Sequence, residues 1–170
     1  MSAEDDRMSD GLFLRDAYKV ALLSPDPSTQ NGAILTDACG DVIARSCNRF
    51  PYGVNLSDER LERPLKYEMI EHAERNAIFM AARAGCRTLG SVLYCPWAAC
   101  ADCARAIIQA GVYRLVRHKD ATLRRAGRNW DGSISIADQM LTEAGVIITD
   151  IEGKITDGLV LRHSGEEWSP

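Results

Sequence analysis

The chain has 170 residues, of which 46% are hydrophobic and 26% are charged, and its formal net charge is −4 at pH 7. These values are typical of a globular protein with one domain, and the negative charge argues against a protein that coats nucleic acid or an anionic membrane. No apolar run approaches the roughly 20 residues that cross a bilayer. The polar start MSAEDDRMSD lacks the basic and apolar segments of a signal peptide. We therefore expect one cytoplasmic domain over residues 1–170, with residues 152–170 as a polar C-terminal tail.

Hydrophobic periodicity and turn residues predict alternating helices and strands along the chain. A long irregular segment is expected from Asn48 to about Tyr67, and a basic loop from His118 to Gly132. Helices are predicted over residues 10–24, 72–85, 100–111 and 133–145, and strands over residues 32–35, 41–45, 91–95, 113–117 and 146–151.

The resulting order is α-β-β-α-β-α-β-α-β. Such alternation favours one central sheet with helices on both faces. In sheets of this kind, site residues usually lie at the carboxyl ends of strands and at the starts of helices.

Two short motifs lie at predicted helix starts. His72 and Glu74 form a His-x-Glu motif in EHAER, and Cys100 and Cys103 form a Cys-x-x-Cys pair in PWAACADC. If both helices start at the same edge of the sheet, one imidazole and two thiolates converge. That is a three-ligand zinc set with an open fourth position, which is typical of a catalytic site. Helix N-termini also favour the thiolate form.

Glu74 lies two residues from His72 and is predicted to sit beside the metal without binding it. Zinc lowers the pKa of a coordinated water from 15.7 to about 7. A neighbouring carboxylate could relay the released proton to a leaving group, as general acid–base catalysis requires.

Other interpretations of the cysteine pair are possible. Cys100 and Cys103 could be a redox pair, or half of a four-cysteine structural zinc site. The chain has no second Cys-x-x-Cys, and a redox pair would not explain the preceding His-x-Glu motif. The other four cysteines have no paired spacing and are interpreted as small apolar residues or free thiols in a reducing compartment.

Taken together, the two motifs resemble the signature of the zinc-dependent cytidine/deoxycytidylate deaminase superfamily, and most of all its deoxycytidylate deaminases. The stretches SPDPSTQNGAIL, CNRFPYG, KYEMIEHAERNAI and CADCARAIIQAGV are similar to segments of those enzymes. The resemblance implies a three-layer α/β/α fold with a five-stranded mixed central sheet. It also implies that Zn²⁺ is the cofactor, that His72, Cys100 and Cys103 are its ligands, and that Glu74 is the catalytic proton shuttle.

The resemblance also implies substrate contacts. Asn48 matches an asparagine that binds the sugar hydroxyl, and the backbone of Ala73 would hold the pyrimidine carbonyl. Trp97, with Ala98 beside it, matches a tryptophan near the base pocket of related polynucleotide cytosine deaminases. A core aromatic is an equally good interpretation of Trp97.

Three departures from the family pattern concern loops. Ala99 replaces the proline expected before the first zinc cysteine, Pro25 replaces a frequent basic residue, and the loop from His118 to Gly132 is longer. This loop is rich in arginine, whose planar fork suits phosphate oxygens. Candidate phosphate-binding residues are therefore Arg124, Arg125 and Arg128, although a solvated surface run is the alternative.

The predicted function is hydrolytic deamination of a cytosine nucleotide, dCMP to dUMP with release of ammonia. Alternatives within the superfamily are deaminases of dCTP, deoxycytidine or a purine nucleotide, and an alternative of another class is a non-catalytic zinc-stabilised binding module. The expected partner is a small-molecule nucleotide, with no nucleic acid and no membrane. The resemblance also implies a homo-oligomer, either a hexamer or a dimer.

Overall fold

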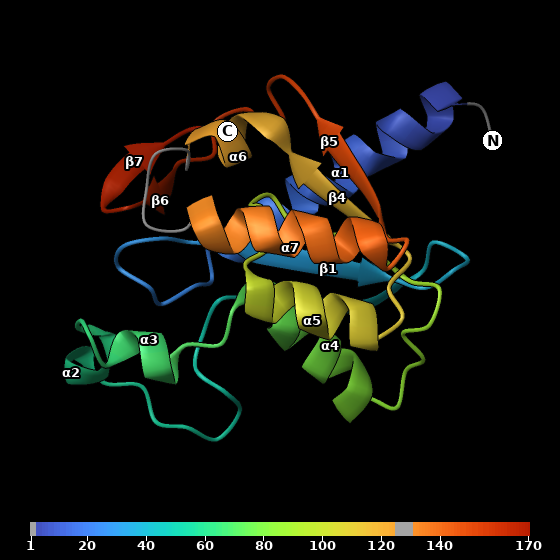
Figure 1. The fold of residues 1–170 in the computed structure, drawn as a ribbon. Helices are drawn as coiled ribbons and strands as arrows, with labels where there is room; N and C mark the ends of the chain where they lie inside the picture. The colour runs from blue at the N-terminus through green and yellow to red at the C-terminus, as the bar shows by residue number, and fades with distance from the viewer. Residues whose placement is uncertain (1–2, 125–130) are drawn as a thin grey trace.

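The computed structural model describes residues 3–124 and 131–170 of the chain (Figure 1). Its centre is a five-stranded sheet in the order β2-β1-β3-β4-β5. The strands are β1 (Gly32–Thr36), β2 (Val42–Cys47), β3 (Val92–Tyr94), β4 (Arg114–His118) and β5 (Ile147–Ile151). β1 runs antiparallel to β2 and β3, whereas β3, β4 and β5 are parallel. The predicted mixed sheet is confirmed.

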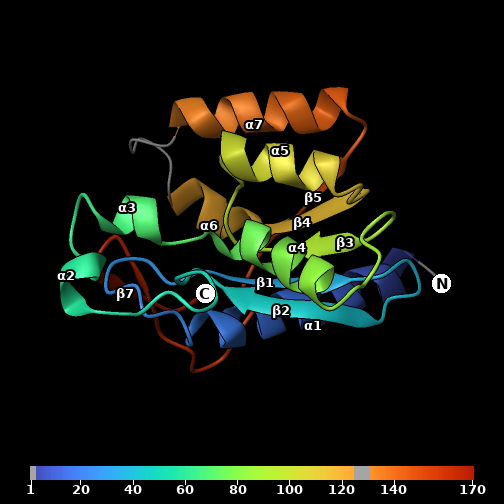
Figure 2. The ribbon, with the colours of Figure 1, turned by 90° about the horizontal axis from the view of Figure 1, so that it is seen from below.

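Helices cover both faces of the sheet, as the alternation of elements predicted. α1 (Ala3–Ala21) lies under one face, and α4 (Ala73–Arg83), α5 (Ala101–Gln109) and α7 (Asp131–Glu143) lie over the other (Figure 2). The three-layer α/β/α architecture is therefore confirmed. Among the described residues, no helix combines the length and the apolar character that a membrane crossing needs.

The alternation of side chains along β1 explains the two layers. All five residues of β1 are buried, and successive side chains of a strand point to opposite faces. Ala33 and Leu35 join the core cluster formed with α4, α5 and α7, whereas Ile34 packs against Leu14 and Ala17 of α1. One strand thus anchors both helical layers.

Gly32, the first residue of β1, allows α1 to approach the sheet closely. A Cβ atom at this position would lie 2.0 Å from the carbonyl oxygen of Ala17 and 2.7 Å from the backbone nitrogen of Ala21. These are backbone atoms of a helix, which cannot rotate away as a flexible side chain can. Glycine is required here for the contact between helix and strand.

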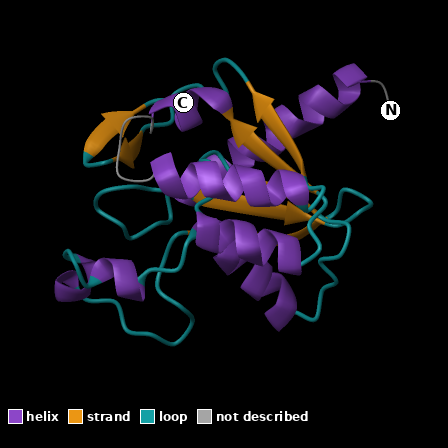
Figure 3. Ribbon diagram, viewed as in Figure 1, coloured by secondary structure: helices purple, strands orange, loops and turns teal. Residues whose placement is uncertain are grey.

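Several short elements lie where the sequence analysis predicted none (Figure 3). They are α2 (Asp58–Leu61), α3 (Lys66–Met69), α6 (Lys119–Arg124), β6 (Leu161–His163) and β7 (Glu166–Trp168). Each has only three to six residues, which is too short for a hydrophobic period to be recognised. α6 occupies the first part of the expected basic loop, and β6 and β7 form a hairpin within the expected polar tail.

Candidate active site

The candidate site lies at one edge of the sheet. The antiparallel pairing of β1 brings its first residues to the same edge as the carboxyl ends of β2 and β3. α4 begins at this edge at Ala73, directly after His72, and α5 begins there at Ala101, directly after Cys100. Two helix N-termini therefore meet beside the ends of the strands, as the sequence analysis predicted.

His72, Cys100 and Cys103 converge at this edge. The Nδ1 atom of His72 lies 3.5 Å from Sγ of Cys100 and 3.4 Å from Sγ of Cys103. The three ligand atoms all lie within 4.8 Å of one another. Tetrahedral zinc, with Zn–N and Zn–S bonds of about 2.0–2.1 and 2.3 Å, separates its nitrogen and sulfur ligands by about 3.5 Å. The spacing and the chemistry of these donors fit zinc.

The side chains of the cluster shift one another's pKa values in a way that favours binding of a cation. The pKa of Cys100 falls to about 3, because this thiol interacts with the Cys103 thiol and with the ring of His72. The same interaction with Cys100, together with burial, raises the pKa of Cys103. Burial lowers the pKa of His72, but the contact with Cys100 and the charge of Glu74 outweigh it, so this pKa is raised. Cys100 is thus the more readily deprotonated thiol of the pair, and a bound metal would displace the proton of Cys103.

Backbone hydrogen bonds hold the lead-in to α4 beside the end of β2. The N–H of Arg49 donates to the carbonyl of Glu71 at 3.1 Å, and the N–H of Glu71 donates to the carbonyl of Arg49 at 2.9 Å. The Glu71 carboxylate also forms an ion pair with Arg75 one turn into the helix. These contacts fix the backbone on both sides of His72.

Glu74 lies in the first turn of α4 and is almost fully buried, with 3% of its surface exposed. The Nδ2 atom of Asn31 donates to its Oε2 atom over 3.4 Å, and the same nitrogen lies 3.3 Å from Sγ of Cys95. Glu74 is not a member of the cluster of possible metal ligands, but it lines the pocket that His72 and Cys100 also line. The carboxylate is therefore oriented by the protein and positioned beside the ligand set.

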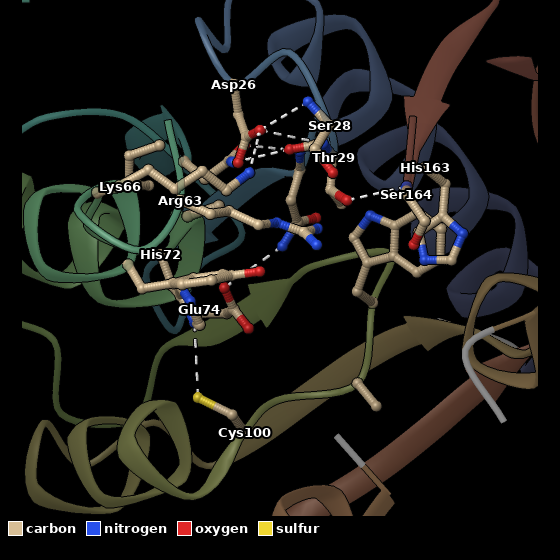
Figure 4. Close-up of a pocket in the computed structure, with 17 residues that line it drawn as sticks. Asp26, Ser28, Thr29, Arg63, Lys66, His72, Glu74, Cys100, His163 and Ser164 are labelled. Carbon is tan, nitrogen blue, oxygen red and sulfur yellow. Dashed lines mark hydrogen bonds and ion pairs between the residues drawn. The ribbon is translucent and has the colours of Figure 1, made fainter. Parts of the chain in front are cut away.

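A pocket of about 570 Å³ opens beside the ligand cluster. This volume lies within the range of roughly 300–1,000 Å³ that is typical of small-molecule sites. Figure 4 shows the residues around it, with His72, Glu74 and Cys100 on one side and His163 and Ser164 on the other. The pocket is lined by Asp26, Ser28, Thr29, Asn31, Asn48, Arg63, Lys66, Tyr67, Ile70, His72, Ala73, Glu74, Trp97, Ala98, Cys100, His163 and Ser164.

Asn48 lines the pocket, but its side-chain amide is engaged with neighbouring loops. Its Oδ1 atom accepts a hydrogen bond of 2.8 Å from the N–H of Asn31, and its Nδ2 atom donates to the carbonyl of Thr29 at 2.8 Å. Asn48 thereby joins the end of β2 to the segment before β1. This is the turn-stabilising use that competes with the predicted sugar contact.

The three other predicted substrate contacts all line the pocket. Ala73 is the first residue of α4, so its N–H belongs to the first turn and has no acceptor within the helix. Trp97 is 1% exposed and its indole N–H donates to the carbonyl of Gln30 over 3.4 Å. Trp97 is thus both a core aromatic and a pocket residue, and Ala98 lies beside it in the chain.

The arginines proposed for phosphate are separated from the pocket or lie outside the described residues. Arg124 is the last residue of α6, where it pairs with Glu166 at 3.8 Å and lies over the ring of Trp168. It is not among the residues that line the pocket. Arg125 and Arg128 fall in the segment 125–130, which is not described.

Two other cations line the pocket, Arg63 and Lys66. The Nζ atom of Lys66 forms a buried ion pair with Oδ1 of Asp26 at 2.8 Å. Oδ1 of Asp26 also accepts hydrogen bonds from the N–H groups of Ser28 and Thr29. The charge of Lys66 is therefore balanced by Asp26 within the pocket wall. Arg63, in contrast, is exposed between α2 and α3, and its guanidinium carbon lies 5.6 Å from the ring centroid of Tyr67.

Sequence reasoning missed much of this wall. Asp26 carried a signal, because an Asp before a proline favours a turn in which the carboxylate accepts backbone hydrogen bonds. Its partner Lys66 is 40 residues away, and no local pattern indicates such a pairing. The same holds for His163 and Ser164, which belong to a hairpin of three-residue strands.

Comparisons with known proteins agree with this geometry. Residues 8–119 match the family model of the cytidine and deoxycytidylate deaminase zinc-binding region. A protein of Aliivibrio fischeri, named as an uncharacterized deaminase in the luxG 3′ region, is 34% identical over 141 residues, which cover 81% of this chain and 89% of that protein. The deoxycytidylate deaminase of Mus musculus is 33% identical over 116 residues, covering 64% of this chain and 63% of that enzyme.

The fold has close counterparts among solved structures. The dCMP deaminase of the cyanophage S-TIM5, solved in complex with dCMP and dUMP, superposes with a TM-score of 0.67 at 23% identity. The superposition covers 89% of this chain and 99% of that enzyme. The three-layer fold, the converging ligand set and the match over residues 8–119 lead to one assignment. The chain belongs to the cytidine and deoxycytidylate deaminase family and is a hydrolytic deaminase.

Proposed function

We propose that this protein catalyses the zinc-dependent hydrolytic deamination of dCMP to dUMP and ammonia. The observation that carries the proposal is the cluster of His72, Cys100 and Cys103 with the buried carboxylate of Glu74 beside it in one pocket. The names of relatives such as the mouse deoxycytidylate deaminase support a cytosine nucleotide as the substrate. In the reaction, water adds its oxygen to C4 of cytosine and the bond from C4 to the amino nitrogen breaks.

His72, Cys100 and Cys103 would hold the metal, which when bound supplies a water activated near neutral pH. Glu74 would accept one proton from the attacking water and deliver it to N3 of the base. It would then take the second proton from the hydroxyl now on C4 and deliver it to the departing amine, which leaves as ammonia. A single carboxylate can serve these steps because its position in the first turn of α4 is fixed and the hydrogen bond from Asn31 orients it. The site keeps an oriented acid outside its ligand set, which a purely structural metal site does not need.

The pocket also offers groups that would orient the nucleotide. The N–H of Ala73 points from a helix N-terminus and suits the pyrimidine carbonyl. The residues Trp97 and Ala98 would flank the base. Asn48 would contact the sugar hydroxyl directly only if it gave up part of its present hydrogen bonding. Otherwise its role is to hold the segment of Thr29 and Asn31, which also lines the pocket.

The phosphate needs a cation at the mouth of the pocket. Arg63 is the best placed, because it lines the pocket and Lys66 is already paired with Asp26. Arg124, Arg125 and Arg128 remain the alternative source. Substitutions of Arg63 and of Arg124 can show which of the two binds the phosphate, since Arg124 pairs with Glu166 and does not line the pocket.

A substrate panel tests the proposal. Ammonia release by protein of measured zinc content would be followed with dCMP, deoxycytidine, dCTP and AMP. We expect the highest kcat/KM with dCMP. A preference for deoxycytidine, dCTP or the purine nucleotide would move the assignment elsewhere in the family, and zinc-loaded protein that deaminates none of them would indicate a binding module. The expected oligomer, hexamer or dimer, can be read from light scattering on the same preparation.

A further inference from the structure

The C-terminal hairpin of β6 and β7 contributes two residues to the pocket, His163 and Ser164. Both lie outside residues 8–119, the region that matches the family model. Figure 4 shows them across the pocket from His72 and Cys100. Part of the wall that faces the ligand cluster is therefore built by a segment that the shared zinc-binding region does not include.

Aromatic contacts connect the hairpin to Trp97. The ring of His163 stacks on the Trp97 indole with 4.4 Å between centroids and 19° between planes. Trp168 of β7 lies 5.3 Å from the same indole. The rings of His163 and Trp97 are both 2% exposed or less. The indole is thus held by two rings of the hairpin, three residues before the ligand Cys100.

Hydrogen bonds connect β6 to the segment before β1. The N–H of Gln30 donates to the carbonyl of Arg162 at 2.9 Å, and the N–H of Arg162 donates to Oε1 of Gln30 at 3.1 Å. The carbonyl of Gln30 also accepts the indole N–H of Trp97. Gln30 therefore couples the hairpin to Trp97 a second time, independently of the ring stack.

The turn of the hairpin is fixed to the pocket wall as well. The N–H of Ser164 donates to Oγ1 of Thr29 at 3.1 Å, and the N–H of Gly165 donates to the carbonyl of Ser28 at 2.8 Å. Ser164 has a φ of 56°, a left-handed conformation that is uncommon for a residue other than glycine. Ser28, Thr29 and Ser164 all line the pocket.

We propose that the C-terminal hairpin is a specificity-determining wall of the substrate site, in which His163 is a positioning residue for Trp97 and Ser164 faces the part of the substrate beyond the base. This inference rests on the proposed deamination of a cytosine nucleotide. His163 acts through the indole, so its loss affects binding of the base rather than the proton transfers at Glu74. The sugar and phosphate extend away from the ligand cluster, toward the turn of the hairpin.

Calorimetric titration with dCMP separates binding from turnover when it is carried out on zinc-loaded Glu74→Gln protein. In this background, adding His163→Ala should raise the Kd for dCMP by roughly 3- to 10-fold, the range expected for loss of one aromatic pair. His163→Phe restores a flat ring and should return the Kd to within about twofold of the parent. Glu167→Ala, an exposed change on β7, is the matched control and should leave the Kd unchanged. Zinc content and Tm are measured for every variant.

The outcomes distinguish this inference from the proposed function. Turnover of dCMP by the wild type, combined with an unchanged Kd in the His163→Ala protein, would overturn the role of the hairpin alone. A Kd that rises equally with alanine and phenylalanine at unchanged Tm would also overturn it, since ring stacking would not be the cause. A parent protein that binds no dCMP would overturn the inference together with the nucleotide assignment.

Discussion

At the scale of single residues, a change at Glu74 allows the two proposed roles of this site, metal binding and proton transfer, to be tested separately. Glu74→Gln keeps the size of the side chain and an oxygen that can accept from Asn31, but it cannot carry a proton. We expect kcat on the preferred substrate to fall by about 10²–10⁴-fold or more, because general acid–base groups contribute about this much. Zinc content measured on the same sample should not change.

Glu68→Gln is the matched control for this change, since Glu68 is exposed in α3 and does not line the pocket. It should retain the kcat of the wild type. A Glu74→Gln protein that kept more than about a tenth of that kcat would show that another group carries the protons.

The phosphate contact can be assigned by comparing Arg63 with Arg124. A charge-assisted hydrogen bond contributes roughly 1.5–3 kcal/mol, so Arg63→Ala should lower kcat/KM on dCMP by about 10- to 150-fold. The same variant should barely affect activity on deoxycytidine, which has no phosphate. Arg124→Ala should leave both activities close to those of the wild type, because Arg124 contacts Glu166 and Trp168 instead of lining the pocket.

The reverse pattern, in which only Arg124→Ala loses activity on dCMP, would assign phosphate binding to the arginine-rich segment instead. Equal losses on dCMP and deoxycytidine in the Arg63→Ala protein would mean that Arg63 supports the pocket without contacting phosphate.

Residue types and their spacing were informative where the chemistry is strict. His72, Cys100 and Cys103 could be grouped from the sequence because few arrangements bring one imidazole and two thiolates to helix starts, and the structure brings them together. The pairing of Lys66 with Asp26 could not be predicted. Lysine and aspartate are common on surfaces, and their burial depends on how a long loop folds back over the end of β2. Arg63 is exposed, and its position at the pocket also depends on the fold of this loop, which no local sequence pattern indicates.

At the scale of elements, the contact between α1 and β1 depends on the absence of a side chain at Gly32. Gly32→Ala places a methyl group 2.0 Å from the carbonyl oxygen of Ala17. We expect the free energy of unfolding to fall by at least about 1–3 kcal/mol, the usual cost of overpacking a core. Urea unfolding measured at equilibrium would give the value.

Gly11→Ala is the matched control within α1, because nothing lies within 4 Å of the added methyl group. Alanine is favoured over glycine in a helix interior by about 1 kcal/mol, so this variant should unfold at higher urea concentration than the wild type. Equal stabilities of the two variants would contradict the close approach of α1 to the sheet.

The long elements were predictable because their apolar periods are complete. α4, α5 and the five sheet strands lie within or close to the predicted ranges. α1 begins at Ala3, earlier than predicted, because its first turns are polar and show no apolar period. β6 and β7 have three residues each. Leu161 and His163 of β6 are buried because they pack against Tyr18 of α1 and against Trp97. Only tertiary contacts define such strands.

At the scale of the whole molecule, the proposed metal ligands lie at the starts of α4 and α5, so a bound metal would join the two helices. A ligand that binds only the folded state stabilises it by about 4.1 kcal/mol at a concentration 1,000 times its Kd. A change of 1 kcal/mol shifts Tm by about 2–4 °C in a domain of this size, so stripping the zinc with a chelator should lower Tm by about 8–16 °C. Differential scanning calorimetry with and without chelator measures the shift.

Two cysteine variants make this test specific. Cys100→Ala should already have the lower Tm and should not respond to the chelator. Cys39→Ser alters an exposed thiol outside the ligand cluster and should respond as the wild type does. A wild-type Tm that is independent of the chelator would contradict a structural contribution of the metal.

Reconstitution of the stripped protein tests the central claim most directly. Zinc is added back in steps, and dUMP formation from dCMP is measured together with the zinc bound per chain. Zinc-dependent deamination at the site of His72, Cys100 and Cys103 predicts activity that rises in proportion to bound zinc and reaches its maximum at one zinc per chain. Full dCMP deamination by zinc-free protein, or none by folded protein that holds one zinc per chain, would contradict it.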